Sequence, residues 1–313
     1  MARPLRIEYP GAIYHVMSRG NQRQNIFRDD SDRRRFLGIL GDACQKSGWQ
    51  VHAYCLMPNH FHLVIETPAA NLVAGMKWLL GVYTMRFNFR HKTCGHLFAG
   101  RFKAVVVDGS GNGYLPTVCD YVHLNPVRAK LIKSGSRLES YVWSSYGEYL
   151  KPAHQRGKWL RADRLFGEKH IPRDSAAGRR EFARQMEERR GEDLREAFGP
   201  IRQGWCFGDE QFRKELLAGS QAAGANHYGS DRQERNEERA LNLLAEQLKQ
   251  LGWTEKTLAQ LAKGDPEKVK LARLLRQETT MTLKWIAQHL SMGSWTYVSN
   301  LLGQREPSES VSS

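Results

Sequence analysis

Two histidines separated by one residue, His60 and His62, lie in the segment 57–66, which reads Met-Pro-Asn-His-Phe-His-Leu-Val-Ile-Glu. The β-branched and apolar residues of this run predict a strand, in which successive side chains point to opposite faces. His60 and His62 would therefore share one face, and Phe61 would point to the other, into a core. Two imidazoles on one strand are able to bind a divalent metal. Taken alone, the pair is more typical of half-exposed strand histidines that have no chemical role.

A tyrosine and an asparagine four residues apart, Tyr121 and Asn125, lie in the segment 121–128, Tyr-Val-His-Leu-Asn-Pro-Val-Arg. A helix is predicted at about 115–124, and on a continuous helix residues four apart share a face. This helix could supply a third metal ligand and a nucleophile, although Pro126 biases Asn125 away from helical geometry. A tyrosine phenol is a weak nucleophile at its ordinary pKa of about 10. It becomes useful when a nearby metal neutralises the charge that develops during an in-line displacement on a phosphodiester.

The 313-residue chain has a formal net charge of +14 and an isoelectric point of about 9.7. The first 150 residues hold 19 basic and 10 acidic side chains, and the remaining residues hold 28 and 23. A basic excess concentrated around the histidine pair predicts a polyanionic partner, which we interpret as nucleic acid.

The sequence shows no targeting segment and no paired cysteine motif. No apolar run is long enough to cross a bilayer, and the N-terminal residues lack the apolar core of a signal peptide. We therefore expect no membrane partner and a cytoplasmic location. The five cysteines contain no Cys-x-x-Cys pair, which argues against a zinc site and favours free thiols.

The pattern of the first 150 residues predicts an α+β fold. Strands are expected at 11–19, 49–57, 60–66 and 98–107, and helices at 29–46, 71–90 and 115–124. The second and third strands would form an antiparallel hairpin through Pro58-Asn59. This order of elements is typical of an antiparallel sheet with helices packed on one face.

Three further parts are expected beyond residue 150. Residues 151–231 are charge-rich and partly helical, which is typical of a connector, and residues 232–305 are helical by pattern. Residues 306–313 are expected to be a disordered tail. Near the end, a helix at 282–290, a turn containing Gly293 and a helix at 295–302 match the helix-turn-helix pattern. An ordinary helical hairpin is the alternative, and the basic charge favours DNA binding. The DNA-contacting candidates of this region are Ser294, Trp295, Thr296, Tyr297 and Asn300.

Four segments together resemble the REP-associated tyrosine transposases, a single-tyrosine branch of the HUH nuclease superfamily with a transposase IS200-like domain. They are Tyr14-His15-Val16, the hairpin at 57–62, Gly100-Arg-Phe-Lys103 and the segment 121–128. The resemblance covers about residues 5–150. It implies a ferredoxin-like catalytic sheet (the HUH nuclease domain, at 1–150) and cleavage of single-stranded DNA beside palindromic hairpins.

Carried over residue by residue, the resemblance implies that His60 and His62 hold a divalent metal and that Asn125 is a third, carbonyl-oxygen ligand. Tyr121 matches the nucleophile that forms a 5′-phosphotyrosine and leaves a free 3′-hydroxyl. Imidazole and amide-oxygen ligands suit Mg²⁺ or Mn²⁺. The covalent intermediate keeps the bond energy, so a second 3′-hydroxyl can rejoin the strands without ATP.

Three nearby residues have other expected roles. Tyr114 lacks the Asn-Pro that follows Tyr121, so we expect Tyr121 to be the nucleophile. His123 is two residues beyond Tyr121 and faces elsewhere, as a structural or DNA-facing residue. His15, on the first strand, lies either beside the metal or packed in the strand.

Five cationic residues flank the predicted site and are candidates for phosphate contacts. They are Arg19, Arg23, Arg101, Lys103 and Arg128. Two other functions stay open from the sequence. One is a helix-turn-helix regulator with an inactive nuclease domain, and the other is a metal-dependent hydrolase in which water attacks. The sequence also leaves open the hairpin that is recognised and whether the protein is a monomer or a homodimer.

Overall fold

The structure is a computed structural model that describes residues 7–133, 135–192, 196–222 and 230–303. The chain divides into two compact units, Met1–Ala225 and Asn226–Ser313. The first unit therefore extends past the boundary expected at residue 150. The tail expected at 306–313 lies outside the described residues. Within the ranges given above, no helix has both the length and the apolar character needed to cross a bilayer.

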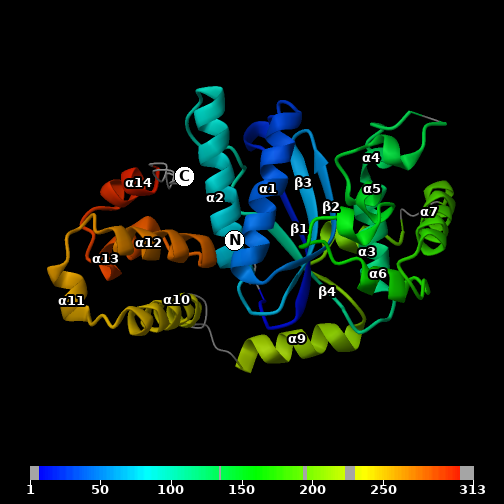
Figure 1. The fold of residues 1–313 in the computed structure, drawn as a ribbon. Coiled ribbons are helices and arrows are strands. Elements are labelled where there is room, and N and C mark those ends of the chain that lie inside the picture. Colours follow the sequence, from blue (N-terminus) through cyan, green and yellow to red (C-terminus); the bar gives the residue numbers. More distant parts are fainter. Residues whose placement is uncertain (1–6, 134, 193–195, 223–229, 304–313) are drawn as a thin grey trace. The chain divides into compact units, whose positions relative to one another are not determined.

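A five-stranded sheet forms the centre of the first unit (Figure 1). Its strands are β1 (Ala12–Arg19), β2 (Gln50–Met57), β3 (His60–Thr67), β4 (Lys103–Val107) and β5 (Cys206–Phe207), in the order β2-β3-β1-β4-β5. Neighbouring strands are antiparallel except β4 and β5, which run parallel. The first four strands form the expected ferredoxin-like antiparallel sheet. The fifth strand comes from the segment that the sequence predicted to be a connector.

The helices of the first unit alternate with these strands and then follow them. They are α1 (Asp30–Ser47), α2 (Leu72–His91), α3 (Tyr114–His123), α4 (Asn125–Arg128), α5 (Ser145–Tyr149), α6 (Asp163–Glu168), α7 (Ala176–Gly191), α8 (Gly199–Gln203) and α9 (Glu210–Ala222). Helix α1 is capped at both ends. Asp29 accepts a hydrogen bond from the Asp32 amide at 3.0 Å, and Gly48 ends the helix with a left-handed φ of 70°.

Helices cover both faces of the sheet (Figure 1). The predicted helical layer consists of α1 and α2 and lies on the face of Phe61, whose ring centroid is 4.9 Å from that of Phe36 in α1. The opposite face carries the histidines, and α3 packs there, with the Tyr121 ring 5.6 Å from that of His62. The expectation of helices on one face is therefore incomplete, because an apolar stripe shows that a helix packs but not on which face.

Aromatic side chains from the predicted connector fill the core beside α3. Phe166, Phe182 and Phe198 are at most 2% exposed, and Phe182 stacks on Tyr149 with ring centroids 5.0 Å apart. Burial of an aromatic ring of this size contributes on the order of 2 kcal/mol. The described residues between 151 and 222 are thus part of the folded first unit and not a solvated connector.

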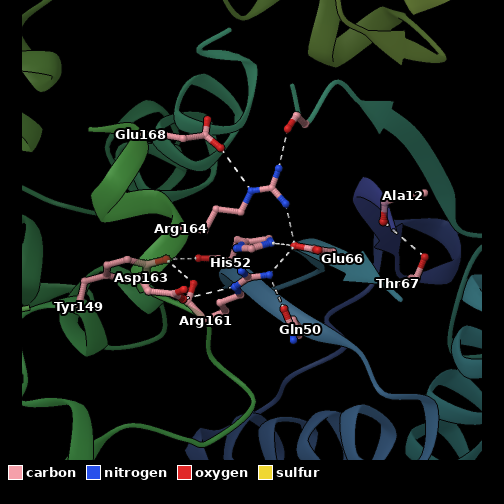
Figure 2. A network of polar contacts seen from close by, with 11 residues as sticks. Ala12, Gln50, His52, Glu66, Thr67, Tyr149, Arg161, Asp163, Arg164 and Glu168 are labelled. Atoms are coloured by element: carbon pink, nitrogen blue, oxygen red, sulfur yellow. Dashed lines mark hydrogen bonds and ion pairs between the residues drawn. The ribbon is translucent and has the colours of Figure 1, made fainter. Parts of the chain in front are cut away.

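A polar network joins this segment to the edge of the sheet (Figure 2). The Glu66 carboxylate on β3 accepts hydrogen bonds from Arg161 at 3.2 Å and Arg164 at 3.0 Å, and it lies 2.9 Å from His52 Nε2 on β2. Arg164 also donates to the Gly109 carbonyl at 2.6 Å. The hydrogen bond with His52 and the positive charges of His52 and both arginines lower the pKa of Glu66 to about 2.

A buried carboxylate with two cationic partners fixes α3. Asp120, which precedes Tyr121, is 2% exposed, and its carboxylate meets Lys169 at 2.9 Å and Arg189 at 3.2 Å. Burial raises the pKa of Asp120, while the two cations act against that rise. Both cations come from the segment beyond residue 150, which therefore helps to position the helix that carries Tyr121.

The second unit is helical in its described part, as expected. Its helices are α10 (Ser230–Leu251), α11 (Glu255–Gln260), α12 (Pro266–Glu278), α13 (Leu283–His289) and α14 (Trp295–Gly303). They enclose a core that includes Leu271, Ile286 and Val298. Gly293, with φ +84°, lies in the turn between α13 and α14. The amine of the fully buried Lys268 donates to the Leu261 carbonyl at 3.1 Å and supports the start of α12.

Candidate active site

The register of the sheet gathers basic side chains on the face that α3 covers. Arg19 of β1 lies opposite His60 of β3, and Met17 lies opposite both His62 of β3 and Lys103 of β4. Directly opposed residues of antiparallel strands share a face, as do alternate residues of one strand. The predicted pair, His60 and His62, therefore lies beside two of the five predicted cations, Arg19 and Lys103.

A third histidine, His15, joins this pair. Its Nε2 lies 2.9 Å from His62 Nδ1, and the two rings are stacked with an interplanar angle of 8°. His60 meets His62 edge to face, with ring centroids 5.0 Å apart, and its Nδ1 lies 2.7 Å from Asn59 Oδ1. His15 is buried in its strand and also lies beside His62, and its place beside a metal stays a prediction. Alternation along β1 was the signal that could have identified it.

All three histidines are neutral at neutral pH. Burial lowers the pKa of His15 to about 3, with a further contribution from the charge of Lys103. Burial and the charge of Arg19 lower the pKa of His60 to about 4, and burial also holds the pKa of His62 well below its ordinary value. A neutral imidazole is the form that binds a metal ion.

Tyr121 packs directly against these rings. Its ring centroid is 5.4 Å from that of His15 and 5.6 Å from that of His62, in edge-to-face contacts. The side chain is 7% exposed. The structure thus brings together the nucleophile and the histidine pair that the sequence predicted from separate segments.

The helix that carries Tyr121 does not continue to Asn125. It ends at His123, Leu124 joins the two helices with φ −87° and ψ 0°, and Asn125 begins the separate helix α4. Pro126, the second residue of α4, has no amide hydrogen to donate to an earlier carbonyl. Tyr121 and Asn125 therefore do not lie on one continuous helix. Asn125 is itself helical, as the first residue of α4, so the bias away from helical geometry that was expected from Pro126 is not seen at Asn125. Asn125 is 8% exposed, and it lies four residues, or about one helical turn, after Tyr121.

Arg128 and a residue that the sequence did not reveal enclose the tyrosine. The Arg128 guanidinium lies 4.6 Å from the Tyr121 ring centroid and 5.3 Å from that of Phe198. Phe198 itself meets Tyr121 edge to face at 5.2 Å. Phe198, the residue before α8, therefore contributes to the burial of Tyr121.

A pocket of about 160 Å³ opens beside Tyr121. Its walls carry three cations, Arg19, Lys103 and Arg202, together with His15. Lys103 Nζ donates to the Arg202 carbonyl at 2.6 Å, and the Nδ1 of His15 is buried without a hydrogen-bond partner among the described residues. Positive charge around a small pocket with an unsatisfied polar atom suits an anionic group such as a phosphate. Sequence reasoning missed Arg202, because no local pattern links α8 to β4.

The remaining predicted residues lie elsewhere. Arg23, in a short 3-10 helix, and Arg101, on a loop, are exposed and do not line this pocket. His123 is 2% exposed and pairs with Ser145 Oγ at 2.8 Å, which supports the structural role. Tyr114 begins α3 and packs edge to face on Phe207 at 5.1 Å.

The donor set fits a divalent metal in its chemistry. Since the amide oxygen of Asn59 only accepts hydrogen bonds, His60 Nδ1 carries the proton and Nε2 is left with its lone pair. Among the described residues, no group of three or more His, Cys, Asp or Glu side chains is arranged to hold a metal. A third protein ligand would therefore be of another type, such as the amide oxygen of the buried Asn125. Its role stays a prediction.

In the second unit, the predicted DNA-contacting residues lie at the start of α14. Ser294 accepts a hydrogen bond from the Tyr297 amide at 3.2 Å and so begins the helix. Trp295 is 55% exposed and Tyr297 is 41% exposed, which is unusual for side chains of this size. Thr296 and Asn300 are exposed as well. Their contact with DNA stays a prediction.

One protein-family model matches part of this sequence. Residues 9–125 match the family model described as Transposase IS200 like, a segment that contains the three histidines, Tyr121 and Asn125. This match agrees with the resemblance that the motifs indicated for the first part of the chain. Among solved structures, the chain is similar to a REP-associated tyrosine transposase bound to a REP hairpin. The identity is 13% over 51% of this chain and 91% of that chain, with a TM-score of 0.41. No curated protein matches the chain.

Proposed function

We propose that the IS200-like transposase domain of this chain cleaves and rejoins single-stranded DNA beside hairpin elements through a covalent bond to Tyr121. The observation that carries the proposal is the contact of the Tyr121 ring with both His15 and His62, at 5.4 and 5.6 Å, beside a cationic pocket. A buried tyrosine that only stabilised the core would not need three cations around it. The preference for hairpin DNA follows from the motif resemblance.

In the proposed step, the Tyr121 phenol loses its proton and its oxygen bonds to the phosphorus of a phosphodiester. The bond from phosphorus to the 3′ oxygen breaks, and that oxygen takes a proton to become a free 3′-hydroxyl. The 5′ side stays attached as a phosphotyrosine. A 3′-hydroxyl from another strand end then attacks the same phosphorus and releases Tyr121, which rejoins DNA without an external energy source.

The cations would hold the phosphodiester in place for this attack. Arg19, Lys103 and Arg202 line the pocket beside Tyr121, and charge-assisted hydrogen bonds to phosphate oxygens are stronger than neutral ones. Arg128 covers the ring face of Tyr121 and limits the directions from which a strand can approach.

His60, His62 and Asn125 would hold a divalent metal, for which Mg²⁺ or Mn²⁺ suits nitrogen and amide-oxygen ligands. When bound, the metal supplies Lewis-acid stabilisation of the charge that develops on the phosphate. His15 contributes by accepting from His62 Nδ1, because this leaves His62 Nε2 free for a ligand bond.

A helix-turn-helix role is proposed for α13 and α14. Trp295, Thr296, Tyr297 and Asn300 project from the start of α14, the part of a recognition helix that contacts base edges in such motifs. This unit would add affinity for duplex DNA near the cleavage site.

The proposal is tested by incubating the full chain with end-labelled hairpin DNA carrying a single-stranded flank, in the presence of Mn²⁺. We expect a protein–DNA adduct that survives SDS, and no adduct with Tyr121→Phe. Tyr114→Phe is the matched control, since it removes a phenol from the same helix, and it should form the adduct.

Other outcomes identify the alternatives. Strand cleavage by the native chain without any adduct would favour a hydrolase in which water attacks. Tight hairpin binding without cleavage would favour a regulator with an inactive nuclease domain.

A further inference from the structure

We propose that single-stranded DNA leaves the Tyr121 site across the surface at the C-terminal end of α2, where Phe89 serves as a platform on which a base stacks. This inference rests on the proposed function, because it names the path of the strand beyond the reacting phosphate. We call this surface the α2-end surface. It consists of Arg23, Arg28, Phe89, Lys92 and Arg101.

Phe89 does not pack in the core of the first unit. It is 88% exposed, the highest value among the large hydrophobic side chains of the described residues. The buried face of α2 is formed by other residues, among them Met76, Tyr83 and Phe87. An exposed phenyl ring is unfavourable in water and offers a flat apolar face to a partner.

A chain of hydrogen bonds links this surface to the histidine site. The Gly20 amide donates to the carbonyl of Asn59, the residue before His60, at 2.8 Å. The side-chain amide of Asn59 donates to the Arg23 carbonyl at 3.1 Å. The loop that carries Arg23 is therefore attached directly to the start of β3.

The loop after α2 continues the same surface. The Asn21 amide donates to the Leu97 carbonyl at 2.9 Å, and the Asn88 side chain donates to the Gly95 carbonyl at 3.0 Å. Asn88 is the neighbour of Phe89 in α2. Two loops and one helix end thus form a continuous edge from His60 to Phe89.

This edge carries uncompensated positive charge. Arg23, Arg28, Lys92 and Arg101 are exposed and have no acidic partner among the described residues. The acidic groups nearby are already paired: Asp29 binds Arg90 at 2.6 Å, and Asp32 meets Arg90 and His91. Exposed cations together with an exposed aromatic ring are typical of surfaces that bind single strands, in which phosphates and bases both need contacts.

A second copy of this chain is a poorer occupant. The apolar part of the surface consists of Phe89 and its i−4 neighbour Met85, which is far less than a stable dimer interface needs. In a two-fold dimer the cations of one copy would also face the same cations of the other. A polyanion with flat apolar groups avoids both problems.

The test measures binding in chains that carry Tyr121→Phe, so that affinity is separated from cleavage. Fluorescence anisotropy with labelled oligothymidine should give about tenfold weaker binding for Phe89→Ala, and Phe89→Trp should restore it. Lys92→Ala should lower the slope of log affinity against log salt by about 0.7. The control Val142→Ala removes a hydrophobic side chain that is 66% exposed outside the α2-end surface and should bind like the parent.

A covalent probe gives a second readout. Cys94 is exposed, whereas the other four cysteines are buried, so a thiol-specific photocrosslinker labels the loop beside Phe89 alone. We expect it to capture oligothymidine, with less capture in the Phe89→Ala chain. Unchanged affinity for oligothymidine in Phe89→Ala would overturn the inference. A lower sedimentation mass of the DNA-free protein in Phe89→Ala would also overturn it, because it would show that Phe89 joins two copies of the chain.

The two proposals fail separately. Binding that depends on Phe89 in a chain that never forms an adduct would contradict the tyrosine chemistry alone. Normal formation of the adduct, with oligothymidine binding that does not change in Phe89→Ala or Lys92→Ala, would contradict only the proposed role of the α2-end surface.

Discussion

The chemistry of single residues at this site depends on which nitrogen of each histidine carries a proton. The amide oxygen of Asn59 assigns the proton of His60 to Nδ1. His62 has the same arrangement only when its Nδ1 donates to His15 Nε2, 2.9 Å away. In the opposite arrangement the proton of His62 is on Nε2, where it blocks a metal. His15 would therefore act as a positioning residue for the proposed metal site.

This role predicts the effect of His15→Phe, which keeps an aromatic ring beside His62 and removes the acceptor. Mn²⁺ should bind about 10- to 100-fold more weakly to the variant, as measured by isothermal titration calorimetry. His15→Gln, whose amide oxygen also accepts, should lose less affinity. Equal Mn²⁺ affinity in the native chain and His15→Phe would exclude the positioning role.

Sequence pattern identified the residues of this site that belong to compact motifs. His60, His62 and Tyr121 each lie in a short segment with a recognisable pattern of neighbours. A single histidine on a strand, such as His15, has no such context, so its role stayed open. Phe198 and Arg202 belong to the segment that pairs with β4 through β5, a contact between distant parts of the chain that no local pattern encodes.

At the scale of elements, Glu66 shows how the segment beyond residue 150 is held on the sheet. Its carboxylate joins β2, β3 and two arginines in one network (Figure 2). Periodicity in the sequence predicted the types of the elements and their succession along the first 124 residues, and the ferredoxin-like sheet was implied by the resemblance. The face on which α3 packs and the end of that helix before Asn125 are decided by tertiary packing and by Pro126.

The Glu66 network predicts a pH-dependent contribution to stability. The folded pKa of about 2 is below the ordinary value of 4.5, so the stabilisation is fully present above pH 4.5 and is lost as the pH falls toward 2. Glu66→Gln should lower the free energy of unfolding by about 2 kcal/mol at neutral pH. The difference from the native chain should narrow below pH 4.5 in urea titrations.

Glu139→Gln is the matched control for this measurement. It removes an exposed carboxylate that pairs with Arg137 at 3.0 Å, and an exposed pair contributes less than about 1 kcal/mol. A difference between Glu66→Gln and the native chain that stays constant from neutral pH to pH 3 would show that the charge of Glu66 is not what stabilises the fold.

At the scale of the whole molecule, the first unit is larger than its motifs indicated. The family match ends at residue 125, yet Phe166, Phe182 and Phe198 are core residues, and Lys169 and Arg189 pair with Asp120. Charge-rich composition favoured a connector because the buried face of α7 contributes only two residues, Phe182 and Met186. Such a narrow face is hard to distinguish from a solvated helix by sequence.

This extent predicts how fragments of the chain behave. A fragment of residues 1–225 should unfold cooperatively on heating, as followed by circular dichroism. A fragment of residues 1–150 should lack a cooperative transition, because its core would expose Tyr149 and leave Asp120 as an unpaired buried charge. Equal melting temperatures of the two fragments would show that residues 151–225 do not contribute to the fold.

The most direct measurement of the central claim is the identity of the residue that is joined to DNA. Trypsin releases residues 104–128 as one peptide, which contains both Tyr114 and Tyr121. Fragmentation of the DNA-linked peptide by mass spectrometry assigns the phosphodiester to one tyrosine. We predict a nucleotide remnant on Tyr121. A remnant on Tyr114, or on a peptide outside residues 104–128, would contradict the account.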